Sequence, residues 1–175
     1  MRDVARPYLE DLSARTSEMT KLGVLDGTDV VYIDRVECPL AVRAYVPIGG
    51  RAPAHSVATG KAILAFLPAD RLRGSGGVLG KNHSKPLQAE FERIRRRGYA
   101  VNRGEWEQAV GAIAAPVFDA QGDVVASVGI ILPSHRLNAA KATQMGTWTA
   151  AAAAEISRKL GYGLDRAWPA AKRAG

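Results

Sequence analysis

Two acidic residues, Glu105 and Glu107, have a spacing that suits acid–base chemistry. They are two positions apart, so in an extended strand both carboxylates would lie on the same face. Such a pair can donate and accept protons in hydrolysis or isomerisation. No base or metal cluster accompanies them in a motif. A small hydrolase or isomerase using Glu105 and Glu107 is therefore the alternative to our leading hypothesis, a binding protein that is not an enzyme.

Other motifs of catalysis or cofactor binding are incomplete. Gly60-Lys61 has the end of a phosphate-binding loop, but His55 replaces its first glycine and Ala62 replaces its serine or threonine. Ser127 lacks the glycine that stands two positions before the serine of a nucleophile elbow. The histidines and Cys38 are too scattered to form a metal-binding pattern. We expect no cofactor, no metal ion and no catalytic residue.

The segment from His55 to Ala62 has the chemistry of a binding site. It begins a predicted helix with small residues. Free backbone N–H groups at a helix start attract carboxylates, and small side chains let a ligand approach. The other interpretation is that Ala58 and Gly60 only allow the helix to pack closely on a sheet. The residues leave both interpretations open.

Composition favours a single cytoplasmic domain. With 175 residues and one cysteine, the chain is long enough to bury a core without disulfides, which suits a reducing compartment. It has no uncharged apolar run of about 18 residues, so we expect no membrane span. The N-terminal residues are too polar for a signal peptide.

The charge is basic overall. The 24 basic and 17 acidic residues give a net charge of +7, with a cluster at Arg93, Arg95, Arg96 and Arg97. A basic cluster can bind nucleic acid directly. Here no aromatic residue is interleaved for base stacking, so a solvated helix face is the favoured interpretation.

The apolar pattern predicts an α+β fold with a central antiparallel sheet. Asp3 can cap the first helix, which is amphipathic because Val4, Tyr8 and Leu12 recur at every fourth residue. In chain order, the expected elements are a helix over 3–16, a hairpin over 19–33 with its turn at 26–29, a strand over 41–46, a helix over 55–67, a loop over 74–80, a helix from Ser84 to Gly98, strands beginning at 99 and covering 110–118 and 124–132, and a helix from Asn138 to Gly161.

Three motifs, in this order, resemble the effector-binding domain of IclR-family transcriptional regulators. They are the segments Gly49–Ala62, Ile94–Ala100 and Gly111–Asp119. The resemblance extends over roughly residues 5–162. It implies a GAF-like domain, with a sheet of about six strands flanked by helices, that belongs to a bacterial regulator. Relatives form dimers or tetramers and bind small organic molecules and, through another domain, operator DNA.

The resemblance also implies a domain organisation. Residues 1–18 would be the end of a linker helix, 19–162 the effector-binding domain and 163–175 a disordered or frayed tail. The N-terminal winged helix-turn-helix of the family is absent from this chain. We therefore expect an excised domain or a natural truncation, and contact with DNA only through the missing domain.

The resemblance implies an effector site at three places in the chain. Backbone N–H groups near the start of the helix would hold an acid group, and two further groups of residues follow the Gly-Tyr-Ala motif and line the last two strands. The implied effector-binding residues are Ala44, Ala58, Thr59, Gly60, Asn102, Glu105, Trp106, Val110, Ala112, Gly129 and Ile131.

The last strand bears on the kind of effector. Gly129 and Ile131 stand where some relatives carry serines, so two hydroxyl groups are missing and a highly polar ligand is disfavoured. We expect an effector with an apolar or aromatic body and one carboxylate or carbonyl end. A purely structural role is the remaining alternative, in which the first and last helices only form a two-fold interface.

Overall fold

The computed structural model describes residues 1–73, 77–79 and 84–163. Its centre is an antiparallel sheet of six strands in the order β3-β2-β1-β6-β5-β4, as the resemblance implied. The strands are β1 (Met19–Asp26), β2 (Asp29–Val36), β3 (Arg51–Pro53), β4 (Ala100–Arg103), β5 (Val110–Phe118) and β6 (Val124–Pro133). The helices are α1 (Arg2–Thr16), α2 (Ala58–Leu64), α3 (Ala69–Arg73), α4 (Lys85–Arg97) and α5 (Ala139–Lys159), with 3-10 turns at Ala54–Ser56 and Ser134–Arg136.

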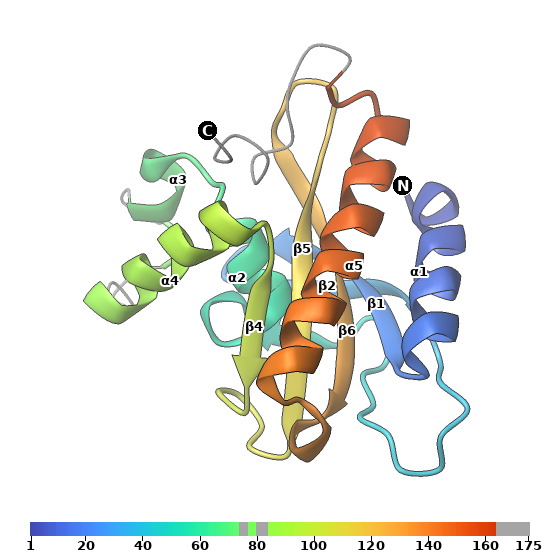
Figure 1. Ribbon diagram of the computed structural model, residues 1–175. Helices are drawn as coiled ribbons and strands as arrows, with labels where there is room; N and C mark the ends of the chain where they lie inside the picture. The colour runs from blue at the N-terminus through green and yellow to red at the C-terminus, as the bar shows by residue number, and fades with distance from the viewer. Residues whose placement is uncertain (74–76, 80–83, 164–175) are drawn as a thin grey trace.

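Helices cover both faces of the sheet. The helices α1 and α5 lie side by side on one face, while α2 lies on the other with α3 and α4 outside it (Figure 1). Alternate residues of β6 therefore enter different cores, with Val128 packed towards α1 and α5, and Ile131 on the opposite face. Burial on both faces explains why β5 and β6 are nearly continuous apolar runs.

Local signals position several elements as predicted. The Ser84 hydroxyl accepts a hydrogen bond from the Leu87 N–H at the start of α4, and the Asn138 side chain accepts one from the Lys141 N–H at the start of α5. The helix α4 ends at Gly98, whose φ of 83° is in the left-handed region. The hairpin of β1 and β2 also forms where it was predicted.

The prediction of a strand over 41–46 is wrong. This segment is irregular, and the third strand is Arg51–Pro53, which pairs with β2. The Val46 carbonyl accepts a hydrogen bond of 2.8 Å from the Arg35 guanidinium, which also lies 4.4 Å from the Tyr45 ring centroid. Contacts with the Arg35 side chain therefore hold this segment in place of the strand pairing that was expected.

The start of α1 also differs from the prediction. Asp3 lies within the first turn and does not cap the helix, because the helix begins one residue earlier. The fully buried positions are Ala5, Leu9 and Leu12, while Val4 and Tyr8 are half-buried. The buried face is rotated away from Val4 and Tyr8 because α1 contacts α5 as well as the sheet.

Smaller differences concern the helical segments and the C-terminal end. The helix predicted over 55–67 is a 3-10 turn followed by the shorter α2, and α3 was not predicted. The loop predicted over 74–80 lies outside the described residues except for 77–79, and the tail predicted over 163–175 does so except for Gly163. None of the helices in the described ranges combines the length and the apolar character needed to cross a membrane.

Candidate ligand-binding site

A pocket of about 210 Å³ lies between the sheet and the start of α2. Strands β1, β2, β5 and β6 contribute to its lining, as do the residues that lead into α2. Two irregular segments also border it, one through Tyr45, Val46 and Pro47 and the other through Trp106 and Glu107. The pocket has the volume of about seven water molecules, which suits a small organic molecule.

Six of the eleven predicted site residues line this pocket. They come from four separate parts of the chain, and the fold brings them together; they are Ala58, Asn102, Trp106, Val110, Ala112 and Ile131. Ala112 and Ile131 are paired across β5 and β6, and both are almost fully buried. The lining around them is mainly apolar, so that part of the pocket can hold a hydrocarbon body.

Three further predicted residues lie beside the pocket. Ala44 is buried against Met19 and Ile131. The Thr59 hydroxyl is 3.3 Å from the hydroxyl of Tyr32, whose side chain lines the pocket. A Cβ at Gly129 would be only 3.1 Å from the Thr59 methyl group, so this glycine lets α2 approach β6 closely. These residues support the pocket wall.

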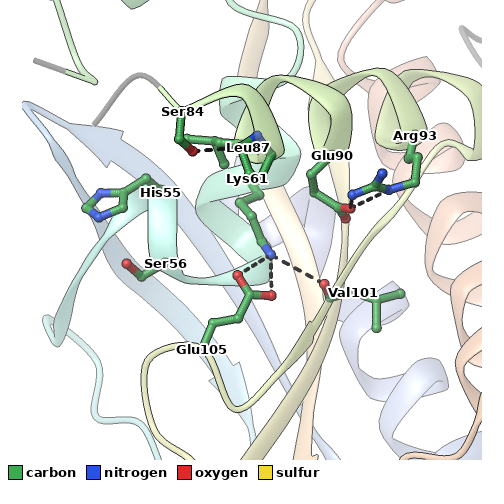
Figure 2. Close-up of a pocket in the computed structure, with 10 residues that line it drawn as sticks. His55, Ser56, Lys61, Ser84, Leu87, Glu90, Arg93, Val101 and Glu105 are labelled. Atoms are coloured by element: carbon green, nitrogen blue, oxygen red, sulfur yellow. Dashed lines mark hydrogen bonds and ion pairs between the residues drawn. The ribbon is translucent and has the colours of Figure 1, made fainter. Parts of the chain in front are cut away.

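Gly60 and Glu105 lie away from this pocket. A Cβ at Gly60 would be 2.0 Å from the Ala54 carbonyl oxygen, so the glycine permits close backbone packing. The Glu105 carboxylate binds the Lys61 ammonium, with Oε1 at 2.6 Å and Oε2 at 2.7 Å, in a neighbouring open pocket (Figure 2). Lys61 is only 2% exposed, so this ion pair neutralises a buried charge.

The acid pair suggested by the spacing of Glu105 and Glu107 does not form. Both residues lie in the irregular segment between β4 and β5, where the two-residue alternation of a strand does not apply. Glu105 faces Lys61, whereas Glu107 borders the pocket beside α2. Because Glu105 is held by Lys61 and lines a different cavity from Glu107, the geometry does not support the enzyme hypothesis. In the described ranges, no cluster of three or more histidine, cysteine or acidic residues could hold a metal ion.

Asn102 is buried and most of its amide is used within the protein. Its Oδ1 accepts hydrogen bonds from the backbone N–H groups of Gly104, at 3.0 Å, and Glu105, at 3.1 Å. Its Nδ2 donates to the Ser56 carbonyl at 2.5 Å. An amide nitrogen carries two N–H groups, so one remains for a ligand. Asn102 mainly fixes the segment after β4 against the turn before α2.

Lys21 is a pocket residue that the sequence reasoning missed. It lies on β1, is only 3% exposed and lines the pocket. Its ammonium nitrogen is 4.1 Å from the centroid of the Tyr32 ring. The available signal was strand alternation, because Lys21 lies two residues after the buried Met19 and therefore on the same face of β1.

Comparisons with known proteins all point to one family. The family described as "Bacterial transcriptional regulator IclR C-terminal" matches residues 1–158. The HTH-type transcriptional regulator XynR of Escherichia coli is 32% identical over 93% of this chain and 68% of its own length. The crystal structure of the Thermotoga maritima IclR has a TM-score of 0.84 and 35% identity, covering 92% of this chain and 68% of that one. The C-terminal domain of E. coli KdgR has a TM-score of 0.79 and 28% identity, covering 92% of this chain and 98% of that domain.

Proposed function

The chain belongs to the IclR family of bacterial transcriptional regulators, as a C-terminal effector-binding domain, and we propose that its effector binds in the pocket between α2 and the sheet. The observation that carries this proposal is the gathering of six predicted site residues around one small pocket. These residues come from α2, β4, β5, β6 and the segment after β4.

The lining suggests the class of effector. Ala58, Ala112 and Ile131 offer an apolar surface, while Lys21 and the remaining N–H of Asn102 can bind an oxygen atom. The volume of about 210 Å³ is below the usual range for drug-sized ligands. We propose an aromatic or apolar effector of about ten heavy atoms with a carboxylate or carbonyl end.

The effector would act by binding one arrangement of the regulator more tightly than another. We propose that residues 1–18 continue a linker from a DNA-binding domain, that residues 19–162 form the sensor, and that α1 and α5 contribute to a dimer or tetramer. In the complete cytoplasmic regulator, a separate N-terminal domain would bind operator DNA. The effector would be released unchanged, without catalytic turnover.

A thermal-shift screen of small organic acids and carbonyl compounds tests this proposal. A ligand at a hundredfold excess over its Kd should stabilise the protein by about 2.7 kcal/mol. For a domain of this size, that corresponds to a rise in Tm of about 5–11 °C.

Two phenylalanine substitutions locate the site. Ala112→Phe fills the pocket and should abolish the shift. Ala120→Phe adds the same side chain at an exposed turn and should leave the shift intact. A shift that survives in A112F, or a screen in which no compound stabilises the wild type, would contradict the proposal.

A further inference from the structure

The described part of the chain contains two lysines that are almost fully buried, and their surroundings differ. Lys61 is 2% exposed and Lys21 is 3% exposed. The Lys61 ammonium contacts both Glu105 carboxylate oxygens and lies 3.5 Å from the Val101 carbonyl oxygen (Figure 2). No carboxylate oxygen of the described residues lies within 4.0 Å of the Lys21 ammonium, which lies over the Tyr32 ring.

Two arginines near this face bind acidic residues of the neighbouring strands and loops. Arg35, the neighbour of Lys21 on β2, binds Glu37 at 2.8 Å and the Val46 carbonyl at 2.8 Å. Arg51, which also borders the pocket, binds the carboxylates of Asp26 at 2.7 Å and Asp29 at 3.2 Å. Two cations side by side on one face of a sheet repel each other, so this face of the pocket favours a negative charge.

One carboxylate of the chain borders the pocket without binding Lys21. Glu107 is exposed at the edge of the pocket, farther than 4.0 Å from the Lys21 ammonium. On the sheet, the position next to Lys21 on β6 is Gly129, which has no side chain that could bind the ammonium. The Lys21 ammonium is therefore buried, borders the pocket and lacks a counter-ion among the described residues.

A buried ammonium without a counter-ion is unfavourable, and contact with an aromatic ring compensates only in part. We infer that Lys21 is the charge anchor of the effector site, and that the effector is an organic anion whose carboxylate binds the Lys21 ammonium beside Tyr32. The apolar body of the anion then lies against Ala58, Ala112 and Ile131. This inference rests on the proposed function and narrows the effector from a carboxylate or carbonyl compound to a carboxylate.

Matched acids and amides test the inference, because each pair has nearly the same shape but differs in charge. The probes are benzoate with benzamide and butyrate with butyramide, titrated by calorimetry into the 175-residue chain. The wild type should bind at least one of the acids about tenfold or more tightly than its amide, since a charge-assisted contact is lost in the amide.

Three variants assign this preference to Lys21. K21M should bring the affinities for acid and amide within about twofold of each other, whereas K21R, which keeps the charge, should retain the preference for the acid. K159M removes one exposed lysine from α5 and should behave as the wild type. Without ligand, K21M should melt at a higher temperature than the wild type because it removes an unpaired buried charge.

The outcomes separate the two proposals. If amides bind as tightly as acids in the wild type, or if K21M keeps the preference for the acid, the role of Lys21 is refuted while the pocket remains a ligand site. A lower melting temperature for ligand-free K21M also refutes it, because Lys21 would then be stabilising the fold. If neither acids nor amides bind, and the wider screen finds no ligand, the proposed function fails and the inference fails with it.

Discussion

Replacing Gly60 by alanine would place a methyl group where the backbone of Ala54 already lies. The new Cβ would be 2.0 Å from the Ala54 carbonyl oxygen, 2.4 Å from its Cα and 2.5 Å from its carbonyl carbon. Ordinary contacts of a Cβ begin near 3.4 Å, so relief requires a separation of about 1.4 Å, the difference between 3.4 and 2.0 Å. Backbone atoms cannot rotate away as a side chain can, so α2 itself must move.

The expected loss of stability follows from two opposing effects. Overpacking a core costs about 1–3 kcal/mol, and a clash with backbone belongs at the upper end of that range. Replacing glycine by alanine inside a helix returns about 1 kcal/mol. The net destabilisation of G60A is therefore about 2 kcal/mol, which lowers the Tm of a domain of this size by about 4–8 °C.

Thermal and urea unfolding of G60A measure this effect. The matched control is G146A in α5, whose Cβ would meet the Tyr99 ring at 2.3 Å; this ring can turn, so the loss should be smaller. A second substitution, Ala54→Gly, should not rescue G60A, because the clashing atoms of Ala54 are backbone atoms. An unchanged or higher Tm for G60A would refute the packing role, and the ligand-approach interpretation of this glycine would regain support.

Three other perturbations test separate parts of the structure. E105Q leaves the buried Lys61 without its counter-ion and should lower the free energy of unfolding, measured with urea, by about 2 kcal/mol. The loss is no larger because Glu105 is half exposed, so that solvent screens the ion pair. K61M/E105Q should be more stable than E105Q. Burial raises the pKa of Glu18 above its ordinary 4.5, despite Arg136, so the folded protein retains a proton that the unfolded chain releases. Stability should therefore fall as the pH rises through the range above 4.5, and E18Q should remove this slope in unfolding curves from about pH 4 to about pH 7. The buried Ser127 hydroxyl lacks a hydrogen-bond partner among the described residues, so S127A should leave the Tm unchanged or raise it by a few degrees; a clear fall would contradict this reasoning.

The elements that were predicted correctly have signals within a few residues. The turn at Gly27 allows a positive φ of 61° between β1 and β2. Ser84 and Asn138 cap their helices through N–H groups three residues ahead, and Gly98 ends α4 through a positive φ. These effects need no distant partner, so they can be recognised in the residues themselves.

The elements that were predicted wrongly depend on side-chain contacts that apolar spacing does not reveal. The apolar alternation over 41–46 is typical of a strand, but Arg35 holds this segment through Tyr45 and Val46. The spacing of Glu105 and Glu107 indicates a shared face only if the backbone there is extended. Asn102 instead binds the N–H of Glu105 and shapes a turn. Arg35 lies about ten residues from the segment that it holds, whereas Asn102 is close in sequence but forms a turn that the spacing of the two glutamates does not reveal.

The ligand site was predicted in the same uneven way. The apolar residues Ala112 and Ile131 could be predicted because the family resemblance implied that inward positions of the last two strands line the site, and both residues line the pocket. Lys21 could not, because lysine is almost never fully buried and its type alone assigns it to the surface. Lys21 is buried because it lines a pocket that is also bordered by Tyr45 and Val46, which are distant from it in the sequence. Residues that violate a local rule without compensation concentrate at functional sites. Lys61 violates the same rule but is compensated by Glu105, so of these two lysines it is Lys21 that points to a ligand.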